Sequence, residues 1–177
     1  MRIIAFLWIA FCLLCSACGE VSIPEPTENY MANSDGNPLL MDYNIPLTSI
    51  NNPDMPFSTY SQQLLMIYYF GPFCPYSKRN YGGIQRIAKE YEHRGLASIA
   101  VSVGNVSEND ILTFIEEQEG SIPFFQDSES EFGRKYGDGY VPRLYLVSPA
   151  GKIILHKNTE DGNLGNIKSD IKKFLPK

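Results

Sequence analysis

Seven consecutive apolar residues, "LLMIYYF" at 64–70, place the strongest constraint on the fold of this chain. A continuous apolar run that is rich in β-prone side chains is typical of a strand buried on both faces of a sheet. A second run of this kind lies at 96–103. Residues 75–93, between the two runs, carry an apolar stripe at helical spacing. Strands that alternate with helices predict an α/β protein with a largely parallel sheet.

The alternation continues to the end of the chain. Ser107 and Asp110 predict the start of the next helix, because their side chains can satisfy the free N–H groups of a first turn. Gly82-Gly83 predicts a kink or loosened turn in the helix before it. Two late strands joined across "SPAG" predict a hairpin, which makes the central sheet mixed. The expected later elements are a helix at 107–118, a strand at 122–127, a helix capped by Asp127 or Ser128 and ending near Tyr136, strands at 143–149 and 152–157, and a helix at 164–175.

Length and composition narrow the class of protein. The 177 residues suffice for one globular domain, and 44 % apolar with 20 % charged residues is an ordinary globular balance. The formal net charge is −5 and no cluster of Lys and Arg stands out, so we expect no nucleic-acid partner.

The N-terminus has the layout of a secretory signal. Arg2 precedes an apolar stretch at 3–14, and small residues lead to Cys18. This resembles a bacterial lipoprotein signal, in which Cys18 would be lipidated and become the mature N-terminus. Cys15 departs from that pattern, because Leu usually stands three residues before the lipidated Cys. An uncleaved membrane anchor and ordinary secretion remain alternatives, and all three place the domain outside the cytoplasm.

The expected organisation has three parts. Residues 1–17 form the lipoprotein signal peptide, 18–60 a tether and irregular lead-in, and 61–177 the folded domain. The lead-in is rich in Pro, Asn and Ser and could contribute a short strand or hairpin. We therefore expect a lipid-anchored protein of the bacterial cell envelope that faces the periplasm. Gly19 after Cys18 is compatible with export to the outer membrane.

The cysteines draw attention to one residue. The chain has four, at 12, 15, 18 and 74, and cleavage at Cys18 leaves Cys74 as the only thiol of the mature domain. An envelope compartment favours disulfides, so an unpaired thiol there is a candidate functional group. The alternative is a structural cysteine that packs as a small apolar side chain.

Cys74 lies where the strand at 64–70 gives way to the first helix. Pro75 suits the first helical position, where its missing N–H is not needed. Free N–H groups and the helix dipole at that end favour a thiolate, and Lys78 and Arg79 are expected to add positive charge. The hydroxyl of Ser77 can be directed towards the sulfur, but it cannot close a disulfide.

Two stretches carry a resemblance to a known family. Residues 68–103, which begin "YYFGPFCPYSKRNYGGI", and residues 139–155, "GYVPRLYLVSPAGKIIL", resemble the thioredoxin-like superfamily. Within it they resemble the redoxin branch, which includes the alkyl hydroperoxide reductase and thiol-specific antioxidant type. The resemblance covers about residues 60–175 and implies a thioredoxin-like fold. It also implies a cis bond at Val141–Pro142, packed against Cys74.

The resemblance assigns roles to the residues around the cysteine. It implies that Cys74, Ser77 and Pro142 form the catalytic group. The residues expected to contact a substrate are Pro75, Tyr76, Val141 and Arg143.

Several positions depart from the family pattern. Ser77 stands in place of the resolving Cys of dithiol members, and Phe73 in place of a common Trp. Arg143 stands where Thr commonly follows the cis proline. Gly71 occupies the place of the Thr that marks peroxiredoxin sites. Neither the dithiol reductase pattern nor the peroxidase pattern is therefore complete.

These observations lead to one main hypothesis and two alternatives. The main hypothesis is an envelope thiol–disulfide oxidoreductase in which Cys74 forms a mixed disulfide or a sulfenate. Its partner would be a disulfide-bearing or thiol-bearing envelope protein, or a low-molecular-weight thiol. The alternatives are a redox-inactive binding or scaffold module and a one-cysteine peroxidase.

We expect neither a cofactor nor a metal. A copper site of the redoxin type would need a second Cys at position 78, where this chain has Lys78. Most aromatic side chains, among them Tyr140 and Tyr145, are expected in the core. Tyr76 is expected to be exposed, where it would line a substrate groove or shield the sulfur.

Overall fold

The computed structural model describes residues 30–177 except 138, 159–163, 165 and 176–177. The predicted signal peptide, the lipidation site Cys18 and the first part of the tether lie outside the described residues. Within the described part of the chain, no helix has the length and apolar character needed to cross a membrane.

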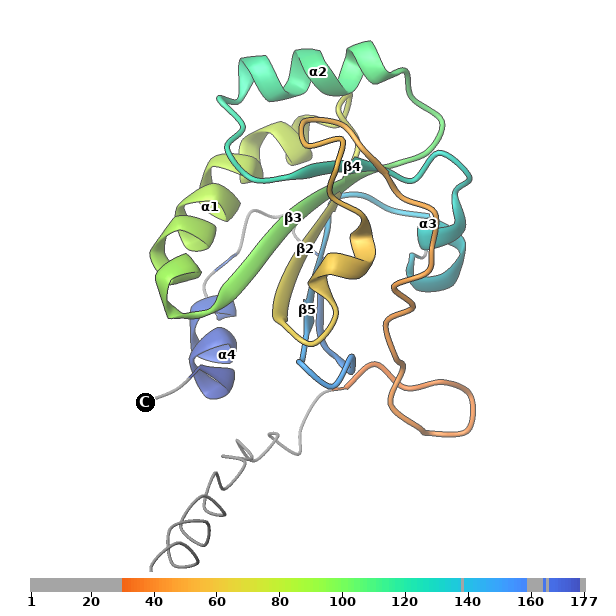
Figure 1. Cartoon of the computed structure of the whole chain (residues 1–177), viewed down its shortest axis with the longest axis vertical. Coiled ribbons are helices and arrows are strands. Elements are labelled where there is room, and N and C mark those ends of the chain that lie inside the picture. Colours follow the sequence, from red (N-terminus) through yellow and green to blue (C-terminus); the bar gives the residue numbers. More distant parts are fainter. Residues whose placement is uncertain (1–29, 138, 159–163, 165, 176–177) are drawn as a thin grey trace, which may run out of the picture.

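The centre of the molecule is a six-stranded mixed sheet with the order β1-β4-β3-β2-β5-β6 (Figure 1). The central strands β2, β3 and β4 are parallel, and β1, β5 and β6 add antiparallel pairings. The predicted α/β fold with a central mixed sheet is confirmed. The strands are β1 (Thr48–Ser49), β2 (Leu64–Phe70), β3 (Leu96–Ser102), β4 (Phe124–Gln126), β5 (Arg143–Val147) and β6 (Ile153–Asn158).

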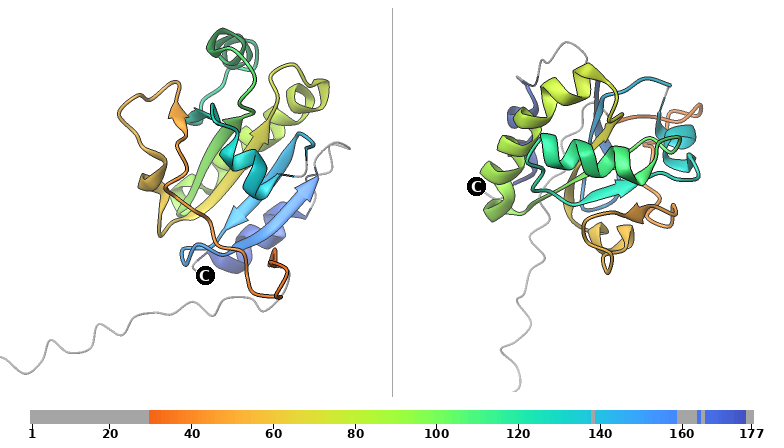
Figure 2. Two further views of the ribbon diagram at one scale, coloured as in Figure 1. Left: turned by 90° about the vertical axis from the view of Figure 1, so that its right-hand side faces the viewer. Right: turned by 90° about the horizontal axis from the view of Figure 1, so that it is seen from above.

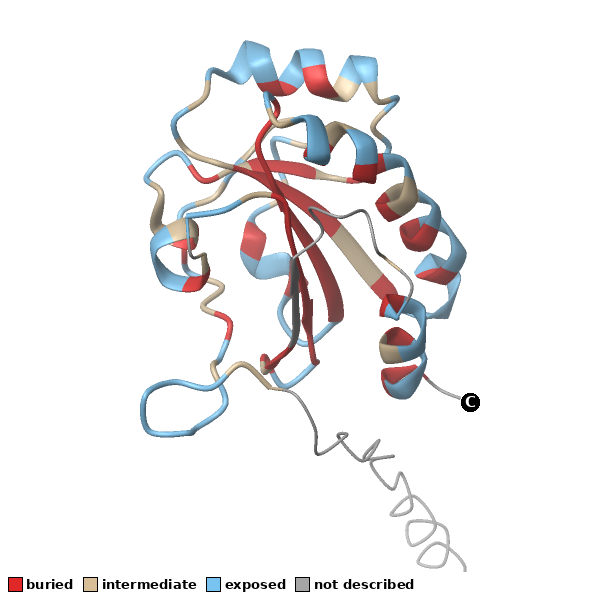
Figure 3. Ribbon diagram, turned by 180° about the vertical axis from the view of Figure 1, so that it is seen from behind, coloured by how far each residue is buried: buried red, intermediate tan, exposed pale blue. Residues whose placement is uncertain are grey.

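Helices cover both faces of the sheet (Figure 2). Apolar side chains of α1, α2 and α4 share one buried cluster with alternate residues of β2, whereas α3 joins the cluster on the other face. All seven residues of β2 are buried, as expected for a strand covered on both sides (Figure 3). The α-helices are α1 (Pro75–Tyr91), α2 (Glu108–Glu117), α3 (Glu131–Tyr136) and α4 (Ile167–Phe174), and the 3-10 helices are η1 (Phe57–Tyr60) and η2 (Glu92–Arg94).

Helix α1 is continuous through Gly82 and Gly83. A Cβ atom at Gly83 would lie 2.6 Å from Cδ1 of Leu164, so the missing side chain makes room for the segment before α4. Gly83 thus allows close packing of Leu164 against α1, while the kink or loosened turn expected at the glycine pair stays a prediction.

The folded unit extends upstream of residue 61, where the domain was expected to begin. Met41, Ile45, Phe57 and Tyr60 are buried in the cluster that α3 joins. Strand β1 pairs antiparallel with β4, which gives the lead-in its expected short strand. The sequence did not predict that this segment is packed into the fold, because turn-forming residues separate its apolar residues and leave no regular hydrophobic period.

Candidate functional site

The turn between β2 and α1 presents Cys74 at the N-cap of α1. Its backbone is extended, with φ −82° and ψ 119°, and Pro75 takes the first turn of the helix. The backbone N–H of Cys74 donates to the carbonyl oxygen of Gly71 at 3.0 Å. The thiol is free, and the residue is partly exposed. This arrangement leaves the sulfur at a helix N-terminus, within reach of solvent.

The second part of the site is the segment before β5. The Val141–Pro142 peptide bond is cis, as the resemblance implied. The Cys74 thiol donates to the carbonyl oxygen of Val141, with 3.6 Å between Sγ and the oxygen. Antiparallel pairing of β5 with β2 places Arg143 opposite Tyr69. The residues just before β5 therefore meet the residues just after β2.

Ser77 is fully buried, and its hydroxyl accepts a hydrogen bond from the backbone N–H of Gly71 at 3.3 Å. The hydroxyl of Tyr68 donates to the carbonyl oxygen of Ser77 at 3.0 Å. The sequence suggested that the Ser77 hydroxyl could point towards the sulfur of Cys74. In the structure this hydroxyl instead forms its hydrogen bond with the backbone of the turn. Ser77 thus closes the Gly71–Cys74 turn from inside the protein.

The two cations of the first helical turn have partners of their own. Lys78 Nζ lies 2.6 Å from Glu117 Oε2 of α2, in an exposed ion pair. The Arg79 guanidinium carbon lies 4.8 Å from the centroid of the Tyr76 ring. The positive charge expected from Lys78 near the sulfur is therefore offset by a carboxylate that local sequence could not reveal.

Three exposed aromatic side chains lie next to the two parts of the site. Phe73 is 66 % exposed, Tyr76 46 % and Tyr140 63 %, and we call these three residues the aromatic rim. The expectation that Tyr140 belongs to the core is wrong, because it belongs to the loop before the cis bond and not to a strand. Arg143 is only 7 % exposed, and its guanidinium carbon lies 5.9 Å from the centroid of the Tyr140 ring.

A buried carboxyl group connects to the end of β2. Asp127 accepts hydrogen bonds from the backbone N–H groups of Phe132 and Gly133 at 3.0 and 2.8 Å, and the Tyr69 hydroxyl lies 3.5 Å from Oδ2. Burial raises the pKa of Asp127, although the backbone N–H groups act in the opposite direction. Asp127 was predicted as one of two possible caps of α3, and it satisfies the N–H groups of that helix although Ser130 holds the N-cap position.

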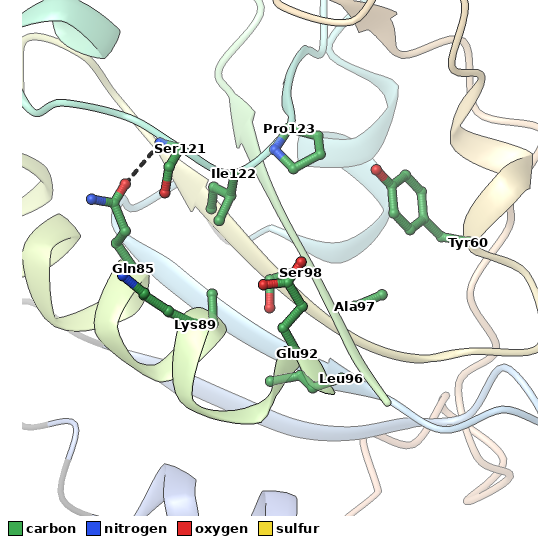
Figure 4. Close-up of a pocket in the computed structure, with 11 residues that line it drawn as sticks. Tyr60, Gln85, Lys89, Glu92, Leu96, Ala97, Ser98, Ser121, Ile122 and Pro123 are labelled. Carbon is green, nitrogen blue, oxygen red and sulfur yellow. Dashed lines mark hydrogen bonds between the residues drawn. The ribbon is translucent and has the colours of Figure 1, made fainter. Parts of the chain in front are cut away.

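A hollow of about 440 Å³ lies beside the last turns of α1 and the beginning of β3 (Figure 4). Its wall includes Gln85, Glu92, Ser98 and Tyr60. Cys74, at the opposite end of α1, does not line it. Among the described residues, no group of three or more His, Cys, Asp or Glu side chains could hold a metal ion.

The fold is identified by comparison with solved structures that have a similar architecture. A putative thiol:disulfide interchange protein DsbE from Chlorobium tepidum is 14 % identical, covers 78 % of this chain and 99 % of its own, and has a TM-score of 0.64. A secreted Mycobacterium tuberculosis disulfide oxidoreductase homologous to E. coli DsbE is 10 % identical, with 70 % and 93 % coverage and a TM-score of 0.59. Peroxiredoxin Q of Xanthomonas campestris is 16 % identical, with 76 % and 94 % coverage and a TM-score of 0.62. The fold is thioredoxin-like.

The sequence narrows this class to a family. Residues 42–156 match the AhpC/TSA family, and the chain belongs to it. No curated protein matches the chain in sequence. The predicted redoxin relationship is therefore confirmed, while the departures at Gly71 and Ser77 stand as features of this particular chain.

Proposed function

We propose that the protein is a thiol–disulfide oxidoreductase that works with one nucleophilic cysteine, Cys74. The observation that carries the proposal is the free thiol of Cys74, a partly exposed residue at the N-cap of α1, with Sγ 3.6 Å from the Val141 carbonyl oxygen. The thiolate is the form of a cysteine that reacts in disulfide exchange. Membership of the AhpC/TSA family and the thioredoxin-like fold agree with this chemistry.

The proposed reaction is an exchange of sulfur bonds. The Cys74 thiolate attacks one sulfur of a client disulfide, the client S–S bond breaks, and the displaced client sulfur leaves as a thiolate that takes a proton from solvent. Ser77 has no sulfur and cannot break the new bond. A second thiolate, from the client or from an external thiol, must attack the mixed disulfide and release Cys74.

The neighbouring residues have proposed roles that follow from their positions. The Val141 carbonyl oxygen accepts a hydrogen bond from the Cys74 thiol and so orients Sγ towards the cis segment. Pro142 is buried and holds that segment against the turn. Pro75 leaves the first helical turn without an N–H that would need a partner, and exposed Tyr76 is available to contact a substrate. Arg143 is only 7 % exposed, so its role is to support the Tyr140 ring from within the protein.

A one-cysteine peroxidase is the second candidate, favoured by the family match and by the similarity to peroxiredoxin Q. In that reaction the Cys74 thiolate attacks the terminal oxygen of a hydroperoxide, the O–O bond breaks, and a sulfenic acid forms on Cys74. The displaced alkoxide or hydroxide takes a proton from solvent and leaves as an alcohol or water. Gly71 stands at the position of the upstream Thr, so the residue that would bind the peroxide there has no side chain.

We also propose that the domain works in the bacterial envelope, anchored through lipidated Cys18. The signal-like N-terminus supports this, and the mycobacterial protein of similar fold is a secreted disulfide oxidoreductase. An envelope protein or a low-molecular-weight thiol would then supply the exchange partner.

Mass spectrometry of the intact protein tests the chemistry. The purified protein is incubated with a disulfide-bonded peptide and, separately, with a hydroperoxide and the sulfenate reagent dimedone. We expect a peptide adduct that dithiothreitol removes and that Cys74→Ala abolishes. A dimedone adduct without a peptide adduct would favour the peroxidase, and the absence of both adducts would leave only a redox-inactive binding module.

A further inference from the structure

We propose that the aromatic rim selects the client: Cys74 exchanges with polypeptides that carry an aromatic side chain beside the reacting disulfide. This inference rests on the proposed exchange reaction and names its substrate class. It distinguishes such polypeptides from low-molecular-weight disulfides, which the reaction alone would also admit.

Most of the large exposed apolar side chains of the described residues belong to the two segments that form the site. Five large apolar residues are exposed in the described part of the chain, and three of them form the rim. Phe73 precedes Cys74, Tyr76 follows it by two positions, and Tyr140 precedes Val141. Exposed aromatic groups that lie together are typical of binding surfaces, whereas single exposed apolar side chains are common on protein surfaces and indicate no function. The other two, Leu40 and Leu112, lie in other parts of the sequence and provide matched controls.

The rings of the rim have supports within the protein. A Cβ atom at Gly71 would lie 3.2 Å from the tip of the Phe73 ring and 3.2 Å from a methyl group of Val141, so this ring lies across Gly71 towards the cis segment. The guanidinium groups of Arg79 and Arg143 lie near the rings of Tyr76 and Tyr140. Rings that are already positioned lose less conformational entropy when a client binds.

The origin of the rings from two segments favours an extended client. Phe73 and Tyr76 come from the turn and the first helical turn, and Tyr140 comes from the loop before the cis bond. The thiol bridges these segments through its contact with the Val141 carbonyl. A partner sulfur that bonds to Sγ must approach at this junction. A polypeptide that continues on both sides of its cysteine can contact rings of both segments, whereas a small disulfide offers much less surface.

The surroundings of two of the rings further favour an aromatic client. The guanidinium carbons of Arg79 and Arg143 lie 4.8 and 5.9 Å from the ring centroids of Tyr76 and Tyr140. An aromatic group next to the client cysteine would find ring faces and guanidinium planes there, whereas a small polar group would gain little from either. We therefore expect a client with an aromatic residue beside its cysteine to react faster than one with a small polar residue.

Two peptides that differ in one residue test this preference. Each carries one cysteine as a mixed disulfide with thionitrobenzoate and has Phe or Ser beside it, so the leaving group is constant. The rate of thionitrobenzoate release by the full protein is measured for each. We expect the Phe peptide to react roughly tenfold faster than the Ser peptide, a difference typical of one well-placed aromatic contact.

Variants attribute the preference to the rim. The ratio of the Phe rate to the Ser rate should fall to about one in the Phe73→Ser/Tyr76→Ser/Tyr140→Ser variant, remain high in Tyr140→Phe, and remain unchanged in Leu40→Ser and Leu112→Ser. Equal rates for the Phe and Ser peptides in the wild type, or a ratio retained by the triple variant, would overturn the inference. Failure of the proposed function looks different: no peptide would release thionitrobenzoate in a Cys74-dependent manner.

Discussion

The hydroxyl of Ser77 accepts a hydrogen bond from the backbone N–H of Gly71, so Ser77 stabilises the turn that carries Cys74. A cysteine at position 77 would serve the dithiol reaction, but a thiol is a weaker acceptor for that N–H. The serine therefore gives the turn a stronger internal contact. Within the described part of the chain, no second cysteine is present to release a mixed disulfide from Cys74.

Replacing Ser77 by Cys should convert the site into a dithiol. Positions 74 and 77 are one helical turn apart at the start of α1, which is the spacing of Cys-x-x-Cys redox sites. After mild oxidation of Ser77→Cys we expect an internal disulfide, detected as protection of both thiols from alkylation in peptide mass mapping. If both thiols remain open to alkylation, the turn holds them apart and a one-cysteine site is imposed by geometry as well as by composition.

Replacing Ser77 by Ala should destabilise the fold. The change leaves the buried Gly71 N–H without its acceptor, which costs about 1–3 kcal/mol. The free energy of unfolding from urea titrations measures this, with Ser58→Ala at an exposed position as the control. Equal stability of the two variants would mean that the Gly71 contact contributes nothing.

Asp127 should make stability depend on pH in a defined direction. Burial raises the pKa of its carboxyl in the folded state above the ordinary value of 3.8, so the folded protein holds the proton more tightly than the unfolded chain. Its contribution to stability is fully present below pH 3.8 and is lost as the pH rises through the folded pKa. We expect the stability of the wild type relative to Asp127→Asn to fall with rising pH across this window. A difference that is constant or rises with pH would contradict this assignment.

The two glycines inside α1 should respond differently to alanine. A Cβ atom at exposed Gly82 meets nothing closer than Arg86 Nη1 at 3.6 Å, so Gly82→Ala should stabilise the fold by about 0.5–1 kcal/mol. At Gly83 the new atom would lie 2.6 Å from Leu164 Cδ1, and moving that side chain should cancel part of the gain. Thermal unfolding of the two variants compares them directly, and a larger gain at position 83 would contradict the packing described for Leu164.

Membrane attachment should depend on Cys18. If Cys18 is lipidated, Cys18→Ser removes the anchor and shifts the protein from the membrane fraction to the soluble envelope fraction. Fractionation of cells that express either form measures this, and the position of the wild type among inner- and outer-membrane markers tests the assignment based on Gly19. Retention of the Cys18→Ser protein in membranes would support an uncleaved apolar anchor instead.

Local sequence patterns were sufficient for the framework of the fold. The apolar run at 64–70 predicted a fully buried strand because burial on both faces leaves no polar position in the pattern. Ser107 and Asp110 predicted a helix start and form a reciprocal capping box, since all the required groups lie within one turn. The family resemblance supplied the cis bond before β5.

The contacts of the site's side chains could not be predicted in the same way. Lys78 finds its carboxylate on a helix 39 positions away in sequence, at Glu117. Tyr140 looked like a core residue by its type alone, and only the path of the loop exposes it. The hydrogen-bond partner of the Ser77 hydroxyl depends on the conformation of the turn that begins at Gly71. A hydrophobic period in the sequence carries no information about that conformation.

The pairing of β5 with β2 also determines when the site can exist. Tyr69 and Arg143 lie opposite each other, so the Val141 carbonyl reaches the Cys74 sulfur only after β5 has docked. If the chain is exported from its N-terminus, the nucleophile emerges into an oxidising compartment well before this partner. During that interval the Cys74 thiol can react with oxidants in the compartment. Rapid docking of the β5–β6 hairpin would shorten this period.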